Sequence, residues 1–324
     1  MDLEARLTVL GSLNIDISVT VPTLPGPGAT VLGGAAAIAP GGKGANQAVA
    51  AARLGADSGI RVRMVGCVGD DDFGRTLRAN LTSEGIDDRA IRTVPGAPSG
   101  IAMITVDESG ENMITVAPGA NYEVGKPELA ALSESAGGTG VLVISAEVPV
   151  PVILAALGDP GGPPPLTVLN LAPAPPVESA AGILKARPDW LVVNESEAAA
   201  VLGRPVGGLA EAARAAADLV AAGARNAVVT AGAAGAAYQC EDQESSRTVP
   251  AFPVRAVDTV GAGDTFVGAL AVALAGGIAP GEAVAAAAAA GATAAARPGT
   301  QAGMPRPGDI LSATGFAWPF DLSK

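Results

Sequence analysis

Short apolar runs of strand length alternate with segments of helical periodicity along most of this chain. This repeated order is typical of a mostly parallel sheet that is covered by helices. Because there is no internal repeat and no long linker, we expect a single α/β domain over residues 1–324. We expect strands at residues 7–10, 62–68, 141–145, 167–169, 191–193, 227–230 and 236–240, and helices at residues 48–54, 72–84, 151–157, 195–202 and 209–222.

Two segments that are far apart in the sequence have extended character and leave no room for a helix. Residues 19–39 contain short apolar pieces that are separated by prolines and glycines. Residues 99–106 and 112–117 are two apolar runs joined by a polar turn, which predicts a hairpin. Together they predict a small discontinuous β layer, formed by residues of about 17–40 and 98–118, that could act as a lid.

The composition excludes several classes of function. Of the 324 residues, 49% are apolar, which is sufficient for a large core. The formal net charge of −12 leaves no basic surface that would indicate binding to nucleic acid or to an anionic membrane. The chain contains no histidine, so triads, metal sites and general bases that depend on histidine are excluded.

Cellular location is indicated by the cysteines and by the apolar segments. Cys67 and Cys240 are flanked by apolar runs and are expected to be buried thiols, which favours a reducing compartment and the cytoplasm by default. The first residues lack the basic and apolar regions of a signal peptide. Residues 283–296 are nearly all Ala and are interpreted as a packed helix rather than a membrane span. The aromatic tail, residues 316–324, is expected to pack against the body.

Residues 258–266 read Asp-Thr-Val-Gly-Ala-Gly-Asp-Thr-Phe, between an extended apolar run (251–257) and a helical segment (265–275). We expect a strand, a glycine turn and the start of a helix. Gly261 and Gly263 allow the backbone to approach a ligand, and the first N–H groups of the helix can face an anion. Asp264 could then accept the proton of a hydroxyl group that attacks a phosphoryl group. The alternative is that Asp264 only caps the helix.

Two further motifs have the character of ligand-binding segments. Asn14 and Asp16 follow the first strand and share one face of an extended chain. Residues 41–47 read Gly-Gly-Lys-Gly-Ala-Asn-Gln, which does not match a Walker loop because the residue after Lys43 is Gly rather than Ser or Thr. The glycines would let the backbone close on a small polar ligand, with Lys43 and Asn46 as donors. The alternatives are a simple turn and a glycine-rich start of a helix.

Polar residues also gather at the ends of later strands, which lie along one edge of a parallel sheet. Glu197 could either complement the dipole of its helix or help to hold a hydrated Mg²⁺. The residues at these strand ends are Glu147, Asn170, Asn194, Glu197, Thr230, Gly232 and Gly235.

These motifs resemble those of the PfkB carbohydrate kinases, and among them the ribokinases, over residues of about 7–305. The resemblance implies a ribokinase-like three-layer sandwich with a β lid, and it makes Asp264 the base beside an anion hole formed by Gly261, Ala262 and Gly263. The implied sugar ligands are Asn14, Asp16, Gly42, Lys43, Gly44, Ala45, Asn46 and Glu147. The implied nucleotide ligands are Asn194, Thr230, Ala231, Gly232, Ala233, Ala234, Gly235 and Gly263. The implied metal ligands are Glu197 for Mg²⁺ and Asp258, Val260, Ala294, Arg297, Gly299 and Gly303 for K⁺.

The resemblance implies ATP-dependent phosphorylation of D-ribose at the 5-hydroxyl group, with Mg²⁺, activation by K⁺ and a homodimer formed through the lid. The chain departs from the family pattern at Ala288, where a His can lie beside the adenine, and at Gly303, where a Ser can help to hold the K⁺. A kinase for 2-deoxyribose, another sugar or a nucleoside is the alternative. A non-catalytic regulator is disfavoured by the intact loop around Asp264.

Overall fold

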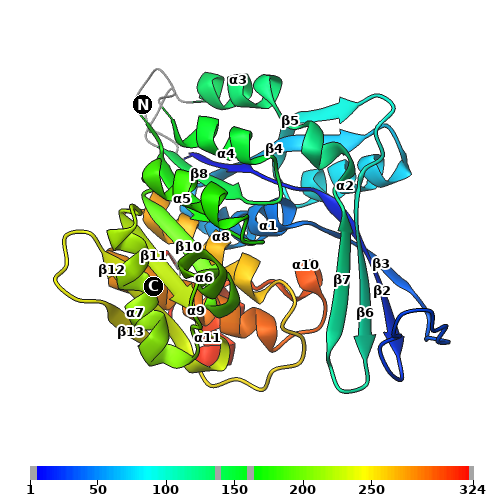
Figure 1. Cartoon of the computed structure of the whole chain (residues 1–324). Helices are drawn as coiled ribbons and strands as arrows, with labels where there is room; N and C mark the ends of the chain where they lie inside the picture. Colours follow the sequence, from blue (N-terminus) through cyan, green and yellow to red (C-terminus); the bar gives the residue numbers. More distant parts are fainter. Residues whose placement is uncertain (1–5, 136–139, 159–163, 321–324) are drawn as a thin grey trace.

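The computed structural model describes residues 6–135, 140–158 and 164–320, which form a layered body and a projecting small sheet (Figure 1). The body contains a nine-stranded sheet in the order β13-β12-β11-β10-β9-β8-β1-β4-β5. Neighbours from β11 to β5 pair in parallel, whereas β12 and β13 pair antiparallel. The strands are β1 (Arg6–Leu10), β4 (Arg61–Gly69), β5 (Asp87–Val94), β8 (Gly140–Ser145), β9 (Leu166–Asn170), β10 (Trp190–Asn194), β11 (Asn226–Thr230), β12 (Gly235–Cys240) and β13 (Arg247–Pro250).

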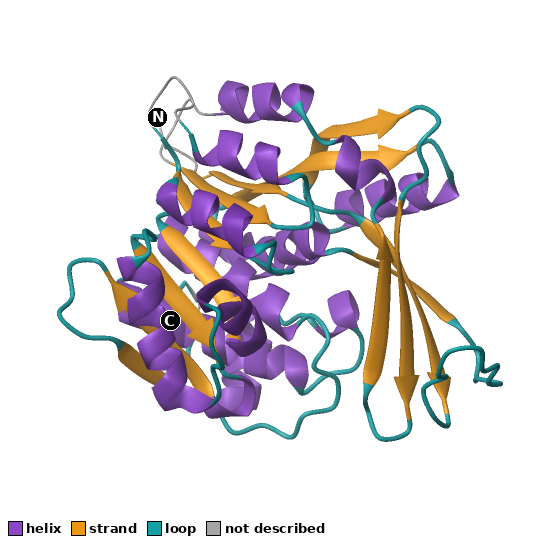
Figure 2. Cartoon of the chain, in the orientation of Figure 1, coloured by secondary structure: helices purple, strands orange, loops and turns teal. Residues whose placement is uncertain are grey.

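Helices cover both faces of this sheet (Figure 2). One layer contains α1 (Lys43–Gly55), α2 (Asp72–Ser83), α8 (Ala262–Ala275), α9 (Pro280–Ala295) and α11 (Pro307–Thr314). The other contains α3 (Lys126–Ser135), α4 (Val150–Leu157), α5 (Val177–Lys185), α6 (Glu195–Leu202) and α7 (Gly208–Ala221). Strand residues alternate between the layers: Val141 and Val143 of β8 pack with the first, and Leu142 and Ile144 with the second. The expected mostly parallel α/β sandwich is confirmed.

The second sheet has four strands in the order β3-β2-β6-β7 and projects from the body (Figure 1). The strands are β2 (Asn14–Val21), β3 (Ala37–Gly41), β6 (Gly100–Asp107) and β7 (Asn112–Ala117). β6 and β7 form the expected hairpin, and β2 joins it by pairing in parallel with β6. The expected small β layer is therefore present, and Asn14 and Asp16 lie within it rather than in the main sheet.

Two glycines set the position of α1. A Cβ atom on Gly44 would lie 2.6 Å from the backbone of Gly11 and Ser12, and a Cβ atom on Gly268 of α8 would lie 2.8 Å from Ala50 Cβ. Close backbone approach therefore needs glycine at both positions. The helix α1 begins at Lys43 rather than at residue 48, so the glycine-rich segment is largely helical.

The prediction of a strand at residues 251–257 is wrong. The last strand ends at Pro250, and Pro253 has no N–H group and restricts the residue before it. At the end of the segment, Val257 N donates to Ala295 O of α9 at 2.8 Å, so the chain leaves the sheet edge and crosses to the helical layer.

Other expectations can be compared directly with the structure. Cys67 and Cys240 are both buried and free, as predicted. Trp318 is buried and its Nε1 donates to Leu54 O, which confirms the packing of the tail as far as residue 320; residues 321–324 lie outside the described part. No helix in the described residues is long and apolar enough to cross a membrane.

Candidate active site

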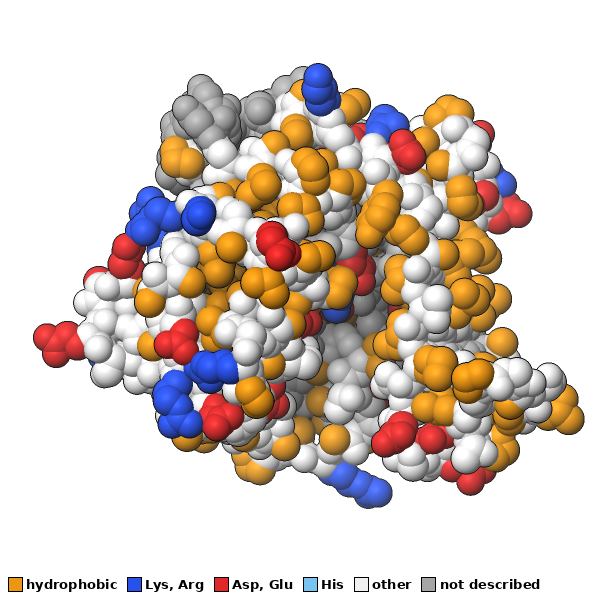
Figure 3. All heavy atoms as spheres, in the orientation of Figure 1, with side chains coloured by type: hydrophobic (Ala, Val, Ile, Leu, Met, Phe, Trp, Pro, Cys, Tyr) orange, Lys and Arg blue, Asp and Glu red, His pale blue; other side chains and the backbone are white. Residues whose placement is uncertain are grey.

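A cavity of about 220 Å³ lies at the carboxyl end of the parallel strands. The polar residues from the ends of β9, β10 and β11 line it together with the loop before α8, as their shared edge predicts. Figure 3 shows this face of the molecule hollowed between the body and the small sheet. The lining residues are Lys43, Asn170, Ala172, Val192, Val193, Asn194, Glu197, Thr230, Thr259, Gly261, Gly263 and Asp264.

Asp264 lies in the first turn of α8 and is only 8% exposed. Its Oδ2 accepts a hydrogen bond from Asn46 Nδ2 at 2.9 Å, and its Oδ1 accepts one from Gln47 Nε2 at 3.0 Å. The N-cap of α8 is instead Gly261, whose φ of 79° is left-handed, and no side chain caps this helix. Asp264 is therefore a buried carboxylate held by two amides rather than a helix cap.

The backbone at the start of α8 faces the cavity in part. Gly261 and Gly263 line the cavity, and nothing lies within 4 Å of the place where a Cβ atom of Gly263 would stand. The Ala262 N–H instead donates to Thr259 O at 3.3 Å. Of the three backbone N–H groups that were expected to bind an anion, those of Gly261 and Gly263 therefore lie on the side of the helix start that faces the cavity.

Asn14 and Asp16 approach from the small sheet. Asn14 is 2% exposed, and its Oδ1 accepts from Asn121 Nδ2 at 2.8 Å. Burial is the main cause that raises the pKa of Asp16 to about 7, and the carboxylates of Glu147 and Asp264 add to it. Asp16 of the small sheet and Asp264 of helix α8 therefore lie close enough to influence each other.

Residues 42–46 frame the space between these carboxylates. Gly42 has a φ of 88°, and a Cβ atom there would lie 2.6 Å from Asn14 N. Lys43 is surrounded by acids: burial lowers its pKa, but Asp264 and Glu147 raise it to a net value above the ordinary one. Lys43 lines the cavity beside the predicted nucleotide residues, whereas Ala45 packs into the core and its N–H donates to Ser12 O.

Glu147 is tied to the same segment. Its Oε2 accepts from Ser12 Oγ and, at 3.3 Å, from Lys43 N. Gly44 N donates in turn to Ser12 Oγ at 3.4 Å. The predicted sugar residues Glu147, Lys43 and Gly44 are thus brought together, with Ser12 as an additional link.

On the opposite side of the cavity, Asn194 and Glu197 form a reciprocal cap of α6. Asn194 Oδ1 accepts from Glu197 N, and Glu197 Oε2 accepts from Asn194 N, both at 2.8 Å. Burial raises the pKa of Glu197. Of the predicted loop 230–235, only Thr230 lines the cavity. Ala231 is buried. Gly232, Ala233 and Ala234 form a short turn (η3, Gly232–Ala234) before Gly235, which is the first residue of β12.

The residues predicted to hold K⁺ converge near the start of α10 (Thr300–Gly303). Asp258 Oδ1 accepts from Val260 N and its Oδ2 from Gly299 N, both at 3.0 Å. A Cβ atom on Gly303 would lie 3.2 Å from Arg297 O and 3.5 Å from Ala294 O. Ala288 lies on α9 and packs against the core.

Sequence reasoning missed three buried amides of this site. Gln47 follows Asn46 directly but was not singled out, and its contact with Asp264 joins residues 217 positions apart. Asn121 and Gln301 carry no local signal, because their contacts with Asn14 and Asn46 join residues that are 107 and 255 positions apart.

Comparison with known proteins gives a consistent result. Residues 4–307 match the model of the pfkB family carbohydrate kinases. A ribokinase of Schizosaccharomyces pombe is 36% identical over 84% of this chain and 86% of its own length. A deoxyribokinase of Salmonella typhimurium is 36% identical over 82% and 84%. The structure of an Arabidopsis thaliana ribokinase with ribose and ATP superimposes with a TM-score of 0.81 at 27% identity, covering 97% of this chain and 100% of that one.

Proposed function

Because this chain belongs to the PfkB family of carbohydrate kinases, we propose that it transfers the γ-phosphoryl group of ATP to the 5-hydroxyl group of D-ribose, giving D-ribose 5-phosphate and ADP. The observation that carries the proposal is the position of Asp264. This buried carboxylate borders the cavity at the start of α8, beside the open Gly263 backbone and within reach of the charge of Asp16. A sugar hydroxyl held there lies between a base and an anion site.

The residues around the cavity then have distinct roles in phosphoryl transfer. Asn14 and Asp16 hold the hydroxyl groups of the sugar from the small sheet, and Asp264 accepts the proton of the attacking hydroxyl. The N–H groups of Gly261 and Gly263 and the dipole of α8 stabilise the charge on the transferred phosphoryl group. Lys43, which lines the cavity with its charge favoured by surrounding carboxylates, faces the phosphates.

We propose Mg²⁺ and K⁺ as the ions of this reaction. Among the described residues, no group of three or more Cys, Asp or Glu side chains could hold a metal ion. Mg²⁺ would be held mainly by phosphates and water, with Glu197 as the nearby acid, and it would neutralise phosphate charge. For K⁺, the carbonyl oxygens of Ala294 and Arg297 and the Asp258 carboxylate supply the oxygen donors that hard cations prefer.

The small sheet supports a proposal of a lid and of a homodimer. Strand register places Ile38, Met103 and Met113 on the face that turns away from Asp16, and these side chains are 64%, 50% and 50% exposed. Figure 3 shows apolar side chains along the small sheet. An exposed apolar face of this kind fits a second copy of the same chain.

We also propose a cytoplasmic location, with which the two free buried cysteines agree.

The test is the release of ADP with ribose, 2-deoxyribose, fructose and adenosine as acceptors, with and without K⁺. We expect ribose to give the highest kcat/KM, because a missing hydroxyl leaves a buried polar group unpaired, at a cost of about 1–3 kcal/mol. The deoxyribokinase at 36% identity makes 2-deoxyribose the second candidate. A higher kcat/KM with 2-deoxyribose or adenosine would assign the enzyme to that acceptor, and ADP release with none of them would reject the kinase assignment.

A further inference from the structure

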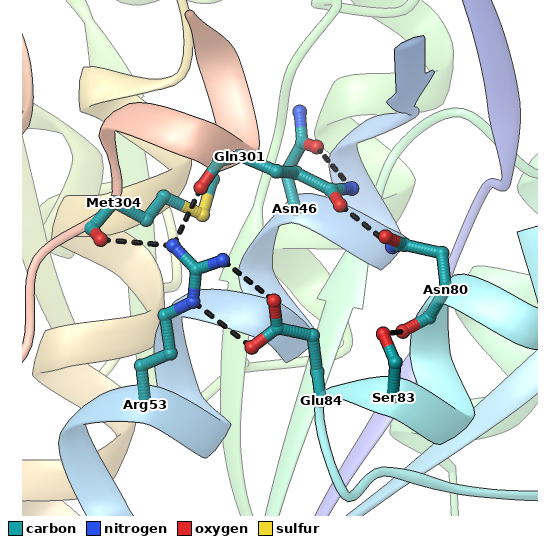
Figure 4. A network of polar contacts seen from close by, with 7 residues as sticks. All are labelled: Asn46, Arg53, Asn80, Ser83, Glu84, Gln301 and Met304. Carbon is teal, nitrogen blue, oxygen red and sulfur yellow. Dashed lines mark hydrogen bonds and ion pairs between the residues drawn. The ribbon is translucent and has the colours of Figure 1, made fainter.

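Three amide side chains from three helices form a continuous chain of hydrogen bonds that ends at Asp264. Asn80 Nδ2 of α2 donates to Gln301 Oε1 at 2.8 Å, and Gln301 Nε2 of α10 donates to Asn46 Oδ1 at 2.9 Å. Asn46 Nδ2 of α1 then donates to Asp264 Oδ2 at 2.9 Å. Figure 4 shows the first two of these contacts between the side chains of α2, α10 and α1.

The donors and acceptors of these side chains give the series of hydrogen bonds one direction. An ionised carboxylate can only accept, so Asn46 must present its N–H to Asp264 and turn its oxygen away. That oxygen requires a donor, which Gln301 supplies, and the oxygen of Gln301 receives the N–H of Asn80 in turn. Every N–H therefore points toward Asp264, and the aligned amide dipoles favour its negative charge.

We propose that Gln301 is a positioning residue for phosphoryl transfer: it holds the Asn46 amide in the orientation that donates to Asp264. Its catalytic meaning rests on the proposed role of Asp264 as the base. Gln301 does not act on the sugar itself. It supplies the donor for the Asn46 oxygen, which would otherwise be buried without a partner in this orientation.

The backbone around Gln301 is itself held firmly. Arg53 Nη1 donates to Gln301 O at 2.6 Å and to Met304 O at 2.9 Å, and Arg53 also pairs with Glu84 (Figure 4). The N-cap of α10, Gly299, donates its N–H to Asp258. The short helix is thus tied by backbone contacts to α1 and to the loop before α8, so a change in the side chain of Gln301 leaves its anchors in place.

Burial makes the orientation of Asn46 depend on Gln301. Asn46 is 5% exposed, and Gln301 and Asp264 are each 8% exposed, so water has little access to replace a lost partner. Three charged side chains also influence Asp264: Lys43, Asp16 and Glu197. They come from α1, the small sheet and α6, and a substitution at Gln301 changes none of them.

The substitution Gln301→Glu tests the proposal with nearly unchanged shape. A glutamate can still accept from Asn80 but cannot donate to Asn46, whose amide then lies between two acceptors and can no longer make good hydrogen bonds to both sides. We expect kcat to fall roughly ten- to hundredfold, as for loss of one hydrogen bond to a charged group, with the KM for ATP unchanged. The acidic limb of the pH–rate profile should move to higher pH, because a lost donor disfavours the ionised carboxylate.

Two further variants separate positioning from other effects. Gln301→Met removes the donor without adding a charge. It should lower kcat and shift the acidic limb of the pH–rate profile in the same directions, but by less than Gln301→Glu. The matched control is Gln239→Glu, the same substitution at a glutamine that is 6% exposed and whose Nε2 donates to the carbonyls of Cys240 and Gln243, at its own strand end and turn. It should lower the melting temperature without moving the pH–rate profile.

A double-mutant cycle with Asn46→Ala gives the decisive comparison, because an effect that passes through Asn46 must vanish in its absence. If Gln301→Met lowers kcat equally in both backgrounds, or if Gln301→Met and Gln301→Glu both keep the wild-type kcat and pH–rate profile, the proposal is wrong. An NMR titration that follows the Asp264 carboxyl carbon in the ligand-free protein tests the orientation of the Asn46 amide without depending on catalysis. ADP release by the wild type reads the kinase activity separately, so failure of one assignment is distinguishable from failure of the other.

Discussion

The Asp16 carboxylate lies directly against the backbone of Gly41, where an added Cβ atom would come within 2.1 Å of Asp16 Oδ2. The obstacle is a side chain rather than backbone, so Gly41→Ala would displace the carboxylate while the strands stay paired. We expect the KM for ribose to rise about tenfold or more, as for one lost hydrogen bond to a charged group, with a smaller change in kcat. Gly182→Ala is the control, since nothing lies within 4 Å of its Cβ position in α5. Unchanged KM in Gly41→Ala would remove Asp16 from the sugar site.

The pKa of Asp16, which burial raises to about 7, predicts that ribose affinity depends on pH. Below pH 7 the carboxyl is protonated in the free enzyme and loses its charged acceptor oxygens. If only the ionised form binds, the dissociation constant of ribose should be about tenfold higher at pH 6 than at pH 8. Calorimetry with the wild type and with Asp16→Asn checks this, because the variant should bind weakly but with no such slope. A flat wild-type curve would contradict the prediction.

The same pKa shift acts on stability with a defined sign. The folded-state pKa of Asp16 lies above its ordinary value of 3.8, so between about pH 4 and 7 the folded protein binds more protons than the unfolded one. Its burial therefore destabilises the ligand-free protein increasingly as pH rises through this window. Asp16→Asn should melt at a higher temperature than the wild type at pH 8 and at nearly the same temperature near pH 4.

Asp264→Asn should separate catalysis from binding. The substituted NH₂ group would face a donor, either Asn46 or Gln47, and turning Gln47 to accept from it would break the bond from Gln47 Nε2 to Asn170 Oδ1, so about one hydrogen bond is lost in either orientation. We expect the fold and the calorimetric affinities for ribose and ATP to survive, and kcat to fall on the order of 10²–10⁴. Near-normal turnover would show that another group takes the proton.

Comparison of Asp264 with Gln301 shows which parts of the site can be predicted from the sequence. The position of Asp264 and Gly263 at the cavity could be predicted because a glycine turn and a helix start lie within one short motif. That of Gln301 could not, because its contact with Asn46 spans 255 positions and depends on how α10 folds back on α1. Residues 251–257 were misassigned because apolar composition alone cannot distinguish an edge strand from an extended crossing to α9. The alternation of apolar runs with helical segments predicted the parallel sheet, whose central strands β8, β9, β10 and β11 are buried on both faces.

The exposed face of the small sheet predicts self-association. Met103 lies at its centre, between Ile17 and Thr115 in register, and Met103→Glu would place a charge within any interface formed there. We expect the wild type to sediment as a dimer and the variant as a monomer. The control is Thr76→Glu on the exposed surface of α2, which should leave the dimer intact. A wild-type monomer at all concentrations would reject this interface.

The last prediction concerns K⁺ and Gly303. A Cβ atom at Gly303 would stand 3.2 Å from Arg297 O, 3.4 Å from Pro298 O and 3.5 Å from Ala294 O, so a serine hydroxyl would join carbonyls that already converge. An added oxygen ligand strengthens binding of a hard cation. We therefore expect KCl to raise kcat/KM of the wild type, and Gly303→Ser to reach half-maximal activation at a lower KCl concentration.

Choline chloride at constant ionic strength is the reference for this titration, because it screens charge without offering a small cation. Gly308→Ser serves as the matched control, since the Cβ position of Gly308 is open and lies in α11 rather than among the carbonyls. Asp258 bridges the loop before α8 and the start of α10, so a cation there would act by holding the Gly261 and Gly263 amides in place. Its effect should thus appear in kcat rather than in the affinity for ribose. Flat activity across KCl in the wild type and in Gly303→Ser would exclude a functional cation site.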